Sequence, residues 1–432
     1  MITAIIIFLI TYYFIASEKV DKTVAALVGA GAMLLFQVAT PAELLSKVDV
    51  DVLGLLIGMM IMVDILASTG FFEWLAIVIA KQSKGRGLII VIEFLLITSI
   101  LSAFLNNVTT VILIAPITIL ICQILEMPAV PLLILEAIFS NITGAATLIG
   151  DPPNMIIGSK AGLSFNSFIA NLAPIVIIIV IVLIVLISLF FKKYYKINPE
   201  IAKRTNKTIP SLAIVDSAKM KKCLIILAIT LFCFFISHSI NLEPGVIAII
   251  FAMIMIFACG TDIQSILEKI DWSTIMFFVG LFMLIGALEA AGVIDSLGVH
   301  ILKLTEGHLF LTILAILWIS AILSAIIDNI PLVIALIPMI QTIAPVFARS
   351  MGISGAEAFT QIEAPMLWAL ALGACFGGNG TLVGASANVV IARVAGRNNY
   401  PITFWKFTKY GIPITFISLI ISSFYLYLRY FY

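Results

Sequence analysis

Apolar segments with the length of a membrane-spanning helix recur along the whole chain. A transmembrane helix needs about 20 consecutive apolar residues. Ten segments approach or reach that length: 2–17, 23–38, 52–69, 131–148, 171–191, 220–238, 243–260, 272–290, 360–376 and 409–429. Charged residues make up only 11% of the chain, against about 25% in a soluble domain. The sequence therefore predicts an all-α polytopic protein of the lipid bilayer.

Two further apolar runs, 88–122 and 309–345, are each interrupted near the middle by polar residues. The interruptions are Asn106-Asn107-Val108-Thr109-Thr110 and Asp328-Asn329-Ile330-Pro331. Each half-run has about 15–18 residues, which is marginal for crossing the bilayer but sufficient for one arm of a re-entrant hairpin. Irregular backbone at membrane depth is tolerated only where protein or a water-filled cavity surrounds it. We therefore predict two re-entrant hairpins with these polar residues at their tips.

One long polar segment separates the two groups of spans. Residues 192–222 contain nine Lys or Arg residues, and cytoplasmic loops of membrane proteins carry such an excess. With this segment inside, five spans on either side and two hairpins, 19 of the 24 basic residues fall on the cytoplasmic face. We therefore predict a basic cytoplasmic linker over residues 192–219 and both termini outside.

Composition and spacing exclude several classes of function. A net charge of +1 offers no basic surface for a nucleic-acid partner. The five cysteines are scattered through apolar segments and the three histidines show no metal-binding spacing, so neither a disulfide framework nor a zinc site is indicated. The sequence shows no nucleophile–base pair. We predict that the protein is not an enzyme and has no cofactor other than a bound Na⁺ or H⁺ as coupling ion.

The two halves of the chain share a pattern of polar residues. At an offset of 222 residues Asn107 aligns with Asn329, and at an offset of 234 residues the segment 144–154 aligns with 378–388. An apolar composition inflates matches among Ile, Leu and Val, but not among Asn, Thr, Gly and Pro. Because each half has an odd number of spans, the two halves insert in opposite orientations. This is the inverted-repeat plan of secondary transporters.

The predicted domains and site follow from this repeat. Repeat 1 covers 1–191, with a hairpin over 88–122 and a broken helix over 131–161; repeat 2 covers 220–432, with a hairpin over 309–345 and a broken helix over 360–396. Such transporters bind ions and substrates where helices are broken, through freed carbonyls and half-helix N-termini. The candidate ion- or substrate-binding residues are therefore Asn106, Asn107, Thr109, Thr110, Gly144, Thr147, Gly150, Asp151, Asn154, Asp328, Asn329, Gly378, Asn379, Thr381, Gly384, Ser386 and Asn388.

Acidic side chains within apolar segments are costly and therefore indicate function. Asp328 lies at a predicted tip opposite the neutral Asn106 of the other half, where a carboxylate is suited to bind Na⁺ or carry a proton. The alternative is a buried structural pair. Asp151 either belongs to the site or caps the half-helix that follows it. Five further acids lie near helix ends or in structural hydrogen bonds on the alternative reading: Asp64, Glu93, Glu136, Glu289 and Glu363.

Three segments carry a resemblance to a known superfamily. They are LSAFLNNVTTVILIAPI (101–117), TLIGDPPNMIIGS (147–159) and GACFGGNGTLVGASANVVIA (373–392). They resemble the ion transporter superfamily, in particular ArsB/NhaD-type permeases with a citrate-transporter-like domain, and most of all the melanosomal P protein and its prokaryotic relatives. The resemblance implies a homodimer in the prokaryotic inner (plasma) membrane. In such a dimer a scaffold domain holds the two subunits together, and a transport domain with two hairpins moves as an elevator.

The resemblance also implies roles for individual residues. In the sodium–dicarboxylate branch, a Ser-Asn-Thr motif at each tip binds Na⁺ and the substrate carboxylates. Asn107 and Asn329 match its Asn, but the residues on either side of them replace Ser and Thr. The hydroxyl donors for a carboxylate are therefore missing, and Asp328 would repel one. The implied Na⁺ sites combine Asn107 with Thr147, and Asp328 with Asn329 and Thr381.

These observations predict a secondary active transporter coupled to Na⁺ or H⁺, either a Na⁺/H⁺ antiporter or an ion-coupled transporter of a small inorganic or organic ion. One alternative is an arsenite or antimonite efflux permease, because neutral arsenite suits polar segments that contain no Lys or Arg. Cys375 would be its soft ligand, although a lone Cys in an apolar run is more often a packing residue. Further alternatives are an organic-anion or dicarboxylate transporter and an anion channel on the same fold.

Overall fold

The computed structural model describes residues 1–432 except 18–19, 83–85, 191–209 and 294–307. Regular secondary structure within the described ranges is helical. Nine helices of this part are long and apolar enough to cross a membrane, and four shorter apolar helices accompany them. The predicted fold class, an all-α polytopic membrane protein, is confirmed at this level. Most of the predicted linker 192–219 lies outside the described residues.

The helices follow the predicted spans closely. The first half contains α1 (Ile2–Ser17), α2 (Lys22–Leu35), α3 (Pro41–Ser46), α4 (Val50–Ala67), α5 (Phe71–Gln82), α6 (Gly87–Phe104), α7 (Asn107–Leu125), α8 (Ala129–Gly144), α9 (Pro152–Ala161) and α10 (Phe165–Phe190). Each predicted span of this half corresponds to one helix, with ends shifted by a few residues. Helix α5 was not predicted, because its 12 residues fall short of a span and include Glu73 and Lys81.

The second half repeats this order. It contains a 3₁₀ turn (Pro210–Ala213), α12 (Ser217–Ile236), α13 (Pro244–Cys259), α14 (Ile263–Leu267), α15 (Trp272–Ala290), α17 (Leu309–Ile326), α18 (Asn329–Met351), α19 (Gly355–Ala358), a π-helical turn (Phe359–Glu363), α20 (Ala364–Gly377), a 3₁₀ turn (Gly378–Gly380), α21 (Ser386–Arg397) and α22 (Phe404–Tyr430). Every residue of α20 is buried. A helix that is apolar on all sides belongs in the core of a large helical protein.

Each interrupted apolar run forms two helices joined by a short tip. The first tip, residues 105–107, joins α6 to α7, and the second tip, residues 327–329, joins α17 to α18. Asn106 and Asp328 are the N-caps, because each side chain accepts a hydrogen bond from the N–H two residues further on, at 2.9 and 3.2 Å. The breaks therefore lie where they were predicted. The arms have 18, 19, 18 and 23 residues, the last of them longer than predicted.

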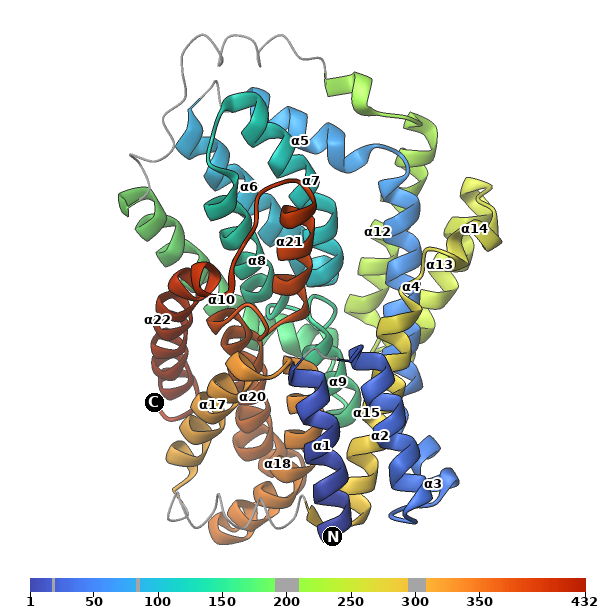
Figure 1. Ribbon diagram of the computed structural model, residues 1–432. Helices are drawn as coiled ribbons and strands as arrows, with labels where there is room; N and C mark the ends of the chain where they lie inside the picture. The colour runs from blue at the N-terminus through green and yellow to red at the C-terminus, as the bar shows by residue number, and fades with distance from the viewer. Residues whose placement is uncertain (18–19, 83–85, 191–209, 294–307) are drawn as a thin grey trace.

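The two hairpins lie in opposite parts of the molecule. Figure 1 shows α6 and α7 in the upper part, α17 and α18 in the lower part, and α8, α9, α20 and α21 between them. We call residues 145–151, between α8 and α9, the first break, and residues 378–385, between α20 and α21, the second break. Helix α9 packs against α18, and α21 packs against α7. This exchange between the halves brings both tips and both breaks into one central region.

Four other helices form what we call the paired layer: α2 with α15, and α4 with α13. They lie on the right of Figure 1. Two ion pairs join the ends of this layer, Lys47 Nζ to Glu289 Oε1 at 2.7 Å and Lys269 Nζ to Asp64 Oδ2 at 3.1 Å. Asp64 and Glu289 are therefore paired near helix ends, and the structural interpretation of these two acids is correct.

Candidate functional site

Each tip contacts its predicted break. The backbone N–H of Asn107 donates to the Gly150 carbonyl at 3.1 Å, and its side-chain amide donates to Asp151 Oδ1 at 3.1 Å. At the second tip, Asp328 Oδ2 accepts a hydrogen bond from the Ser386 hydroxyl at 2.8 Å. The structure therefore brings together the tips and breaks that the sequence placed in one site.

Equivalent side chains hold both breaks in the same irregular shape. The amide of Asn154 donates to the Thr147 carbonyl at 2.9 Å, and the amide of Asn388 donates to the Thr381 carbonyl at 3.0 Å. The Thr147 hydroxyl donates to a carbonyl of α6, and the Thr381 hydroxyl donates to a carbonyl of α17. These four side chains were predicted as ligands. In the structure they satisfy backbone groups that unwinding has freed, so they shape the site.

Replacing Asn388 with alanine is expected to destabilise the second break. The carbonyls of Gly378 and Thr381 would lose their donor, and an unsatisfied buried polar group costs about 1–3 kcal/mol. We expect a lower unfolding temperature for the purified protein in a thermal-shift assay. Asn398→Ala on the neighbouring turn is the matched control, because its amide donates to the Val394 carbonyl at the exposed surface. Equal shifts in the two variants would contradict this role.

The four predicted glycines lie in pairs across the breaks. A Cβ atom at Gly150 would lie 2.5 Å from the Gly144 carbonyl oxygen, and one at Gly384 would lie 2.7 Å from the Gly378 carbonyl oxygen. Any larger residue would therefore push against backbone. The glycines allow the two ends of each break to touch, and this contact fixes where the half-helices α9 and α21 begin.

Seven polar side chains from both halves form what we call the central cluster: Asn107, Asn141, Asp151, Asn154, Cys375, Asn379 and Asn388. Asn141 donates to Asn379 Oδ1 at 2.8 Å and to Asn388 Oδ1 at 2.9 Å, and the Cys375 thiol lies 3.8 Å from Asn154 Oδ1. All seven residues are at most 3% exposed. These contacts join the first half of the chain to the second.

Asn141 was not among the predicted site residues. It lies inside α8, one turn before Gly144, where a single Asn in an apolar helix gives little signal. Its equivalent at the offset of 234 residues is Cys375, which the sequence suggested only as a packing residue or a soft ligand. In the structure both side chains contact an Asn of the opposite half. The repeat offset is the signal that pairs them.

Three buried polar atoms in this region have no hydrogen-bond partner in the described part of the chain: Asp151 Oδ2, Asn329 Nδ2 and Asn379 Nδ2. Buried polar atoms in native proteins are generally paired with protein, water or an ion. Asp151 also has an unfavourable charge interaction with Asp328, which a cation would relieve. The Asp151 side chain makes no capping hydrogen bond to α9, so the capping alternative for this residue is wrong. Its free oxygen is suited to bind a cation.

One basic side chain reaches the second tip. Lys22 Nζ lies 2.8 Å from Ser386 Oγ and 3.5 Å from Asp328 Oδ2, over the ring of Phe277. The sequence placed Lys22 in a cytoplasmic loop and predicted a site without basic residues, and the latter prediction is wrong. Lys22 was missed because it begins α2, far from the tip in the sequence, and only folding brings the two together.

The remaining predicted residues and acids have local surroundings. Thr109 is half-buried on the first turn of α7, and the Thr110 hydroxyl is buried without a hydrogen-bond partner among the residues described. Glu136 is buried in α8 and accepts a hydrogen bond from the Thr118 hydroxyl at 2.6 Å. Within the described ranges, no group of three or more His, Cys, Asp or Glu residues is arranged to hold a metal ion.

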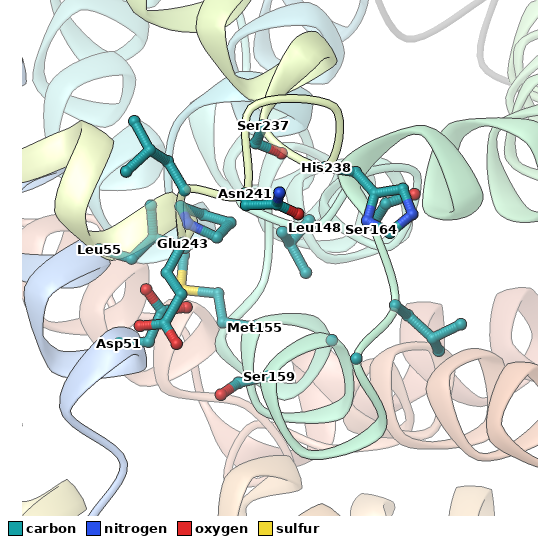
Figure 2. Close-up of a pocket in the computed structure, with 15 residues that line it drawn as sticks. Asp51, Leu55, Leu148, Met155, Ser159, Ser164, Ser237, His238, Asn241 and Glu243 are labelled. Carbon is teal, nitrogen blue, oxygen red and sulfur yellow. The ribbon is translucent and has the colours of Figure 1, made fainter.

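A cavity of about 330 Å³ lies beside the first broken helix and was not predicted. It is lined by the start of α4, by α9 and by the loop between α12 and α13. Figure 2 shows the carboxylates of Asp51 and Glu243 at one end and the His238 ring near Ser164 at the other. These residues come from separate segments that only the tertiary fold brings together.

A polytopic helical bundle with unwound helices and a buried carboxylate at its centre has the features of a membrane transporter. Residues 12–373 match the CitMHS family, which is described as a family of citrate transporters. The chain belongs to this family, in agreement with the citrate-transporter-like resemblance of its sequence.

Known relatives support this assignment. The chain is 41% identical over 434 residues to a "46 kDa membrane protein" of Mycobacterium leprae, covering 99% of each chain. It is 40% identical over 435 residues to an "uncharacterized transporter" of Mycobacterium tuberculosis, covering 100% of this chain and 99% of that one. It is 32% identical to the human P protein over 497 residues, covering 96% of this chain but only 58% of the relative. Relatives whose names state an activity are transporters and not enzymes, as predicted.

Proposed function

We propose that the protein is a secondary active transporter that couples the movement of a small solute to Na⁺ or H⁺. The observation that carries this proposal is Asp151. It is 1% exposed, its Oδ2 lacks a hydrogen-bond partner among the described residues, and it lies where the first tip meets the first break. A carboxylate at this depth needs a cation or a proton. Movement of the surrounding tips and breaks would then bind or release that ion together with the solute.

The proposed cation positions are those suggested by the sequence. The first is Asn107 with the break that Thr147 holds, and the second is Asp328 and Asn329 with the break that Thr381 holds. Both threonine hydroxyls donate to helix carbonyls. We therefore assign the threonines to shaping the sites, and assign ligation to carboxylate, amide and freed carbonyl oxygens.

An elevator built on two inverted repeats is the proposed mechanism. Contacts recur at equivalent positions: α4 packs on α13 as α15 packs on α2, and Asn154 holds the first break as Asn388 holds the second. The paired layer would form the scaffold and the homodimer contact. The two hairpins with α8, α9, α20 and α21 would form the transport domain. The solute would cross with this domain.

A small organic anion is the substrate class that two observations favour. The matching family is described by citrate, and Lys22 supplies beside Ser386 the basic side chain that the polar segments lack. The half-helix α21 begins at Ser386, and N-terminal ends of helices attract anions. A carboxylate at this end and a cation near Asp151 would occupy neighbouring positions.

A thermal-shift screen of the purified protein tests this proposal. Na⁺, Li⁺, protons, citrate, dicarboxylates and arsenite are added in turn, with choline chloride as the control for ionic strength. Selective binding to the native state raises the unfolding temperature, and we expect Na⁺ or pH to do so and citrate to add to it. A response to arsenite alone would favour the efflux permease. A steady current in liposomes without any opposing Na⁺ or H⁺ gradient would favour the channel. Absence of any response to both Na⁺ and pH would contradict coupled transport.

A further inference from the structure

The ion pair between Lys22 and Asp328 joins two different parts of the molecule. Lys22 is the first residue of α2, in the paired layer, whereas Asp328 belongs to the second tip. The ammonium and carboxylate groups are 3.5 Å apart, and the Ser386 hydroxyl lies 2.8 Å from each of them. Any movement of the tip relative to α2 must therefore separate these charges.

Helix α2 is closely attached to its partner in the paired layer. The Thr23 hydroxyl donates to the Ser273 carbonyl at 2.9 Å, directly after Lys22. Further along, Gly280 of α15 lies so close to Ala26 of α2 that a Cβ atom there would be 2.9 Å from the Ala26 carbonyl carbon. Lys22 is therefore fixed to the paired layer by packing, and the tip is the part that moves.

The two partners differ in their need for each other. The Lys22 side chain is 36% exposed and that of Asp328 is 11% exposed. Lys22 keeps access to water and the face of the Phe277 ring when it is separated. Asp328 has little water, so its charge must be balanced by another cation. Its other charged or titratable neighbours, Tyr12 and Asp151, do not provide one.

We infer that Lys22 is the resident counter-ion of Asp328 and is displaced when the coupling cation binds there. The cation, Na⁺ or H⁺, and Lys22 compete for one carboxylate, so the tip leaves α2 only when the cation has taken the place of the ammonium group. This role rests on the proposed function, because it requires a cation at the second tip. The first half has no equivalent pair, since Asn106 and Pro244 occupy the matching positions. Only the second tip carries this competition.

The effect of Lys22→Gln on cation binding tests this inference. The full-length protein is purified, and its unfolding temperature is titrated with NaCl at constant ionic strength and, separately, with pH. Removing a competing cation should lower the NaCl concentration at half-maximal stabilisation about tenfold, within the 5- to 150-fold range of typical coupling between sites. Under proton coupling, the pH midpoint should instead move upward by about one unit. Lys22→Arg keeps the charge and should remain close to the wild type.

Lys47→Gln is the matched control, because Lys47 forms a similar ion pair with Glu289 in the paired layer. It should lower stability without moving either midpoint. If Lys22→Gln leaves both midpoints unchanged while Asp328→Asn abolishes the response, the counter-ion role is wrong and coupled transport stands. If the wild type responds to neither Na⁺ nor pH, the proposed function fails first. Lys22→Cys, measured before and after reaction with 2-aminoethyl methanethiosulfonate, gives the same comparison should Lys22→Gln not fold, and restoring the charge should restore the midpoint.

Discussion

Replacing Asp151 with asparagine is expected to reduce ion-coupled transport by about 10- to 100-fold, because a hydrogen bond or ligand contact to a charged group contributes about 1.5–3 kcal/mol. Asparagine has nearly the same shape and keeps an oxygen for the Asn107 amide. The folded protein should therefore persist, while the charge that holds the cation is lost. The measurement is solute uptake into proteoliposomes with and without a Na⁺ or H⁺ gradient, alongside the unfolding temperature.

Asp262→Asn is the matched control for this prediction. Asp262 caps α14 at the exposed surface, where its carboxylate accepts from the Ser265 N–H at 2.9 Å. Asparagine caps helices as well as aspartate, so this variant loses the same charge without losing transport or stability. If Asp151→Asn transports at the wild-type rate and keeps its dependence on the gradient, Asp151 is not the coupling carboxylate.

Gly150→Ala is expected to prevent the first break from closing. The added methyl carbon would lie 2.5 Å from the Gly144 carbonyl oxygen and 2.6 Å from the Ser102 carbonyl oxygen. Both atoms belong to backbone, so a side-chain rotation cannot relieve the clash. Overpacking a closed core costs about 1–3 kcal/mol and occasionally more. We expect a large fall in unfolding temperature or a loss of folded protein, together with loss of transport.

Gly396→Ala on α21 separates this clash from a general effect of adding a methyl group. A Cβ atom at Gly396 would have no atom of the described residues within 4 Å. Alanine is favoured over glycine within a helix by about 0.5–1 kcal/mol, so this variant should be as stable as the wild type or slightly more stable. Wild-type stability of Gly150→Ala would mean that the break is wider than the structure shows.

Local features of the fold could be predicted because they depend on neighbouring residues. Apolar length locates the spans, and Asn106 and Asp328 end one helix and begin the next because their side chains cap the N–H groups that follow. The repeat offset also placed Asn154 and Asn388 correctly at the two breaks. The assigned role changed, however. Hydrogen bonds to the carbonyls of Thr147 and Thr381 show that these side chains hold the backbone, which residue type alone does not reveal.

Contacts between distant segments could not be predicted in this way. Apolar helix faces are rich in Ile, Leu and Val and are chemically interchangeable, so the sequence does not say which helix packs on which. Asn141 therefore gave no sign that it would reach Asn388. The cavity lined by Asp51 and His238 depends in the same way on α4 and α12 meeting α9. Only side chains at the breaks stood out from the apolar background.

The sequence by itself determined that this protein is a polytopic helical membrane transporter of the CitMHS family and where its helices break, because apolar length, caps and glycines act over one or two helical turns. Only the tertiary structure decided which charges meet. It brought Lys22 to Asp328 and left one oxygen of Asp151 without a hydrogen-bond partner among the described residues. The physical reason is that an ion pair forms wherever packing places opposite charges, irrespective of their distance along the chain.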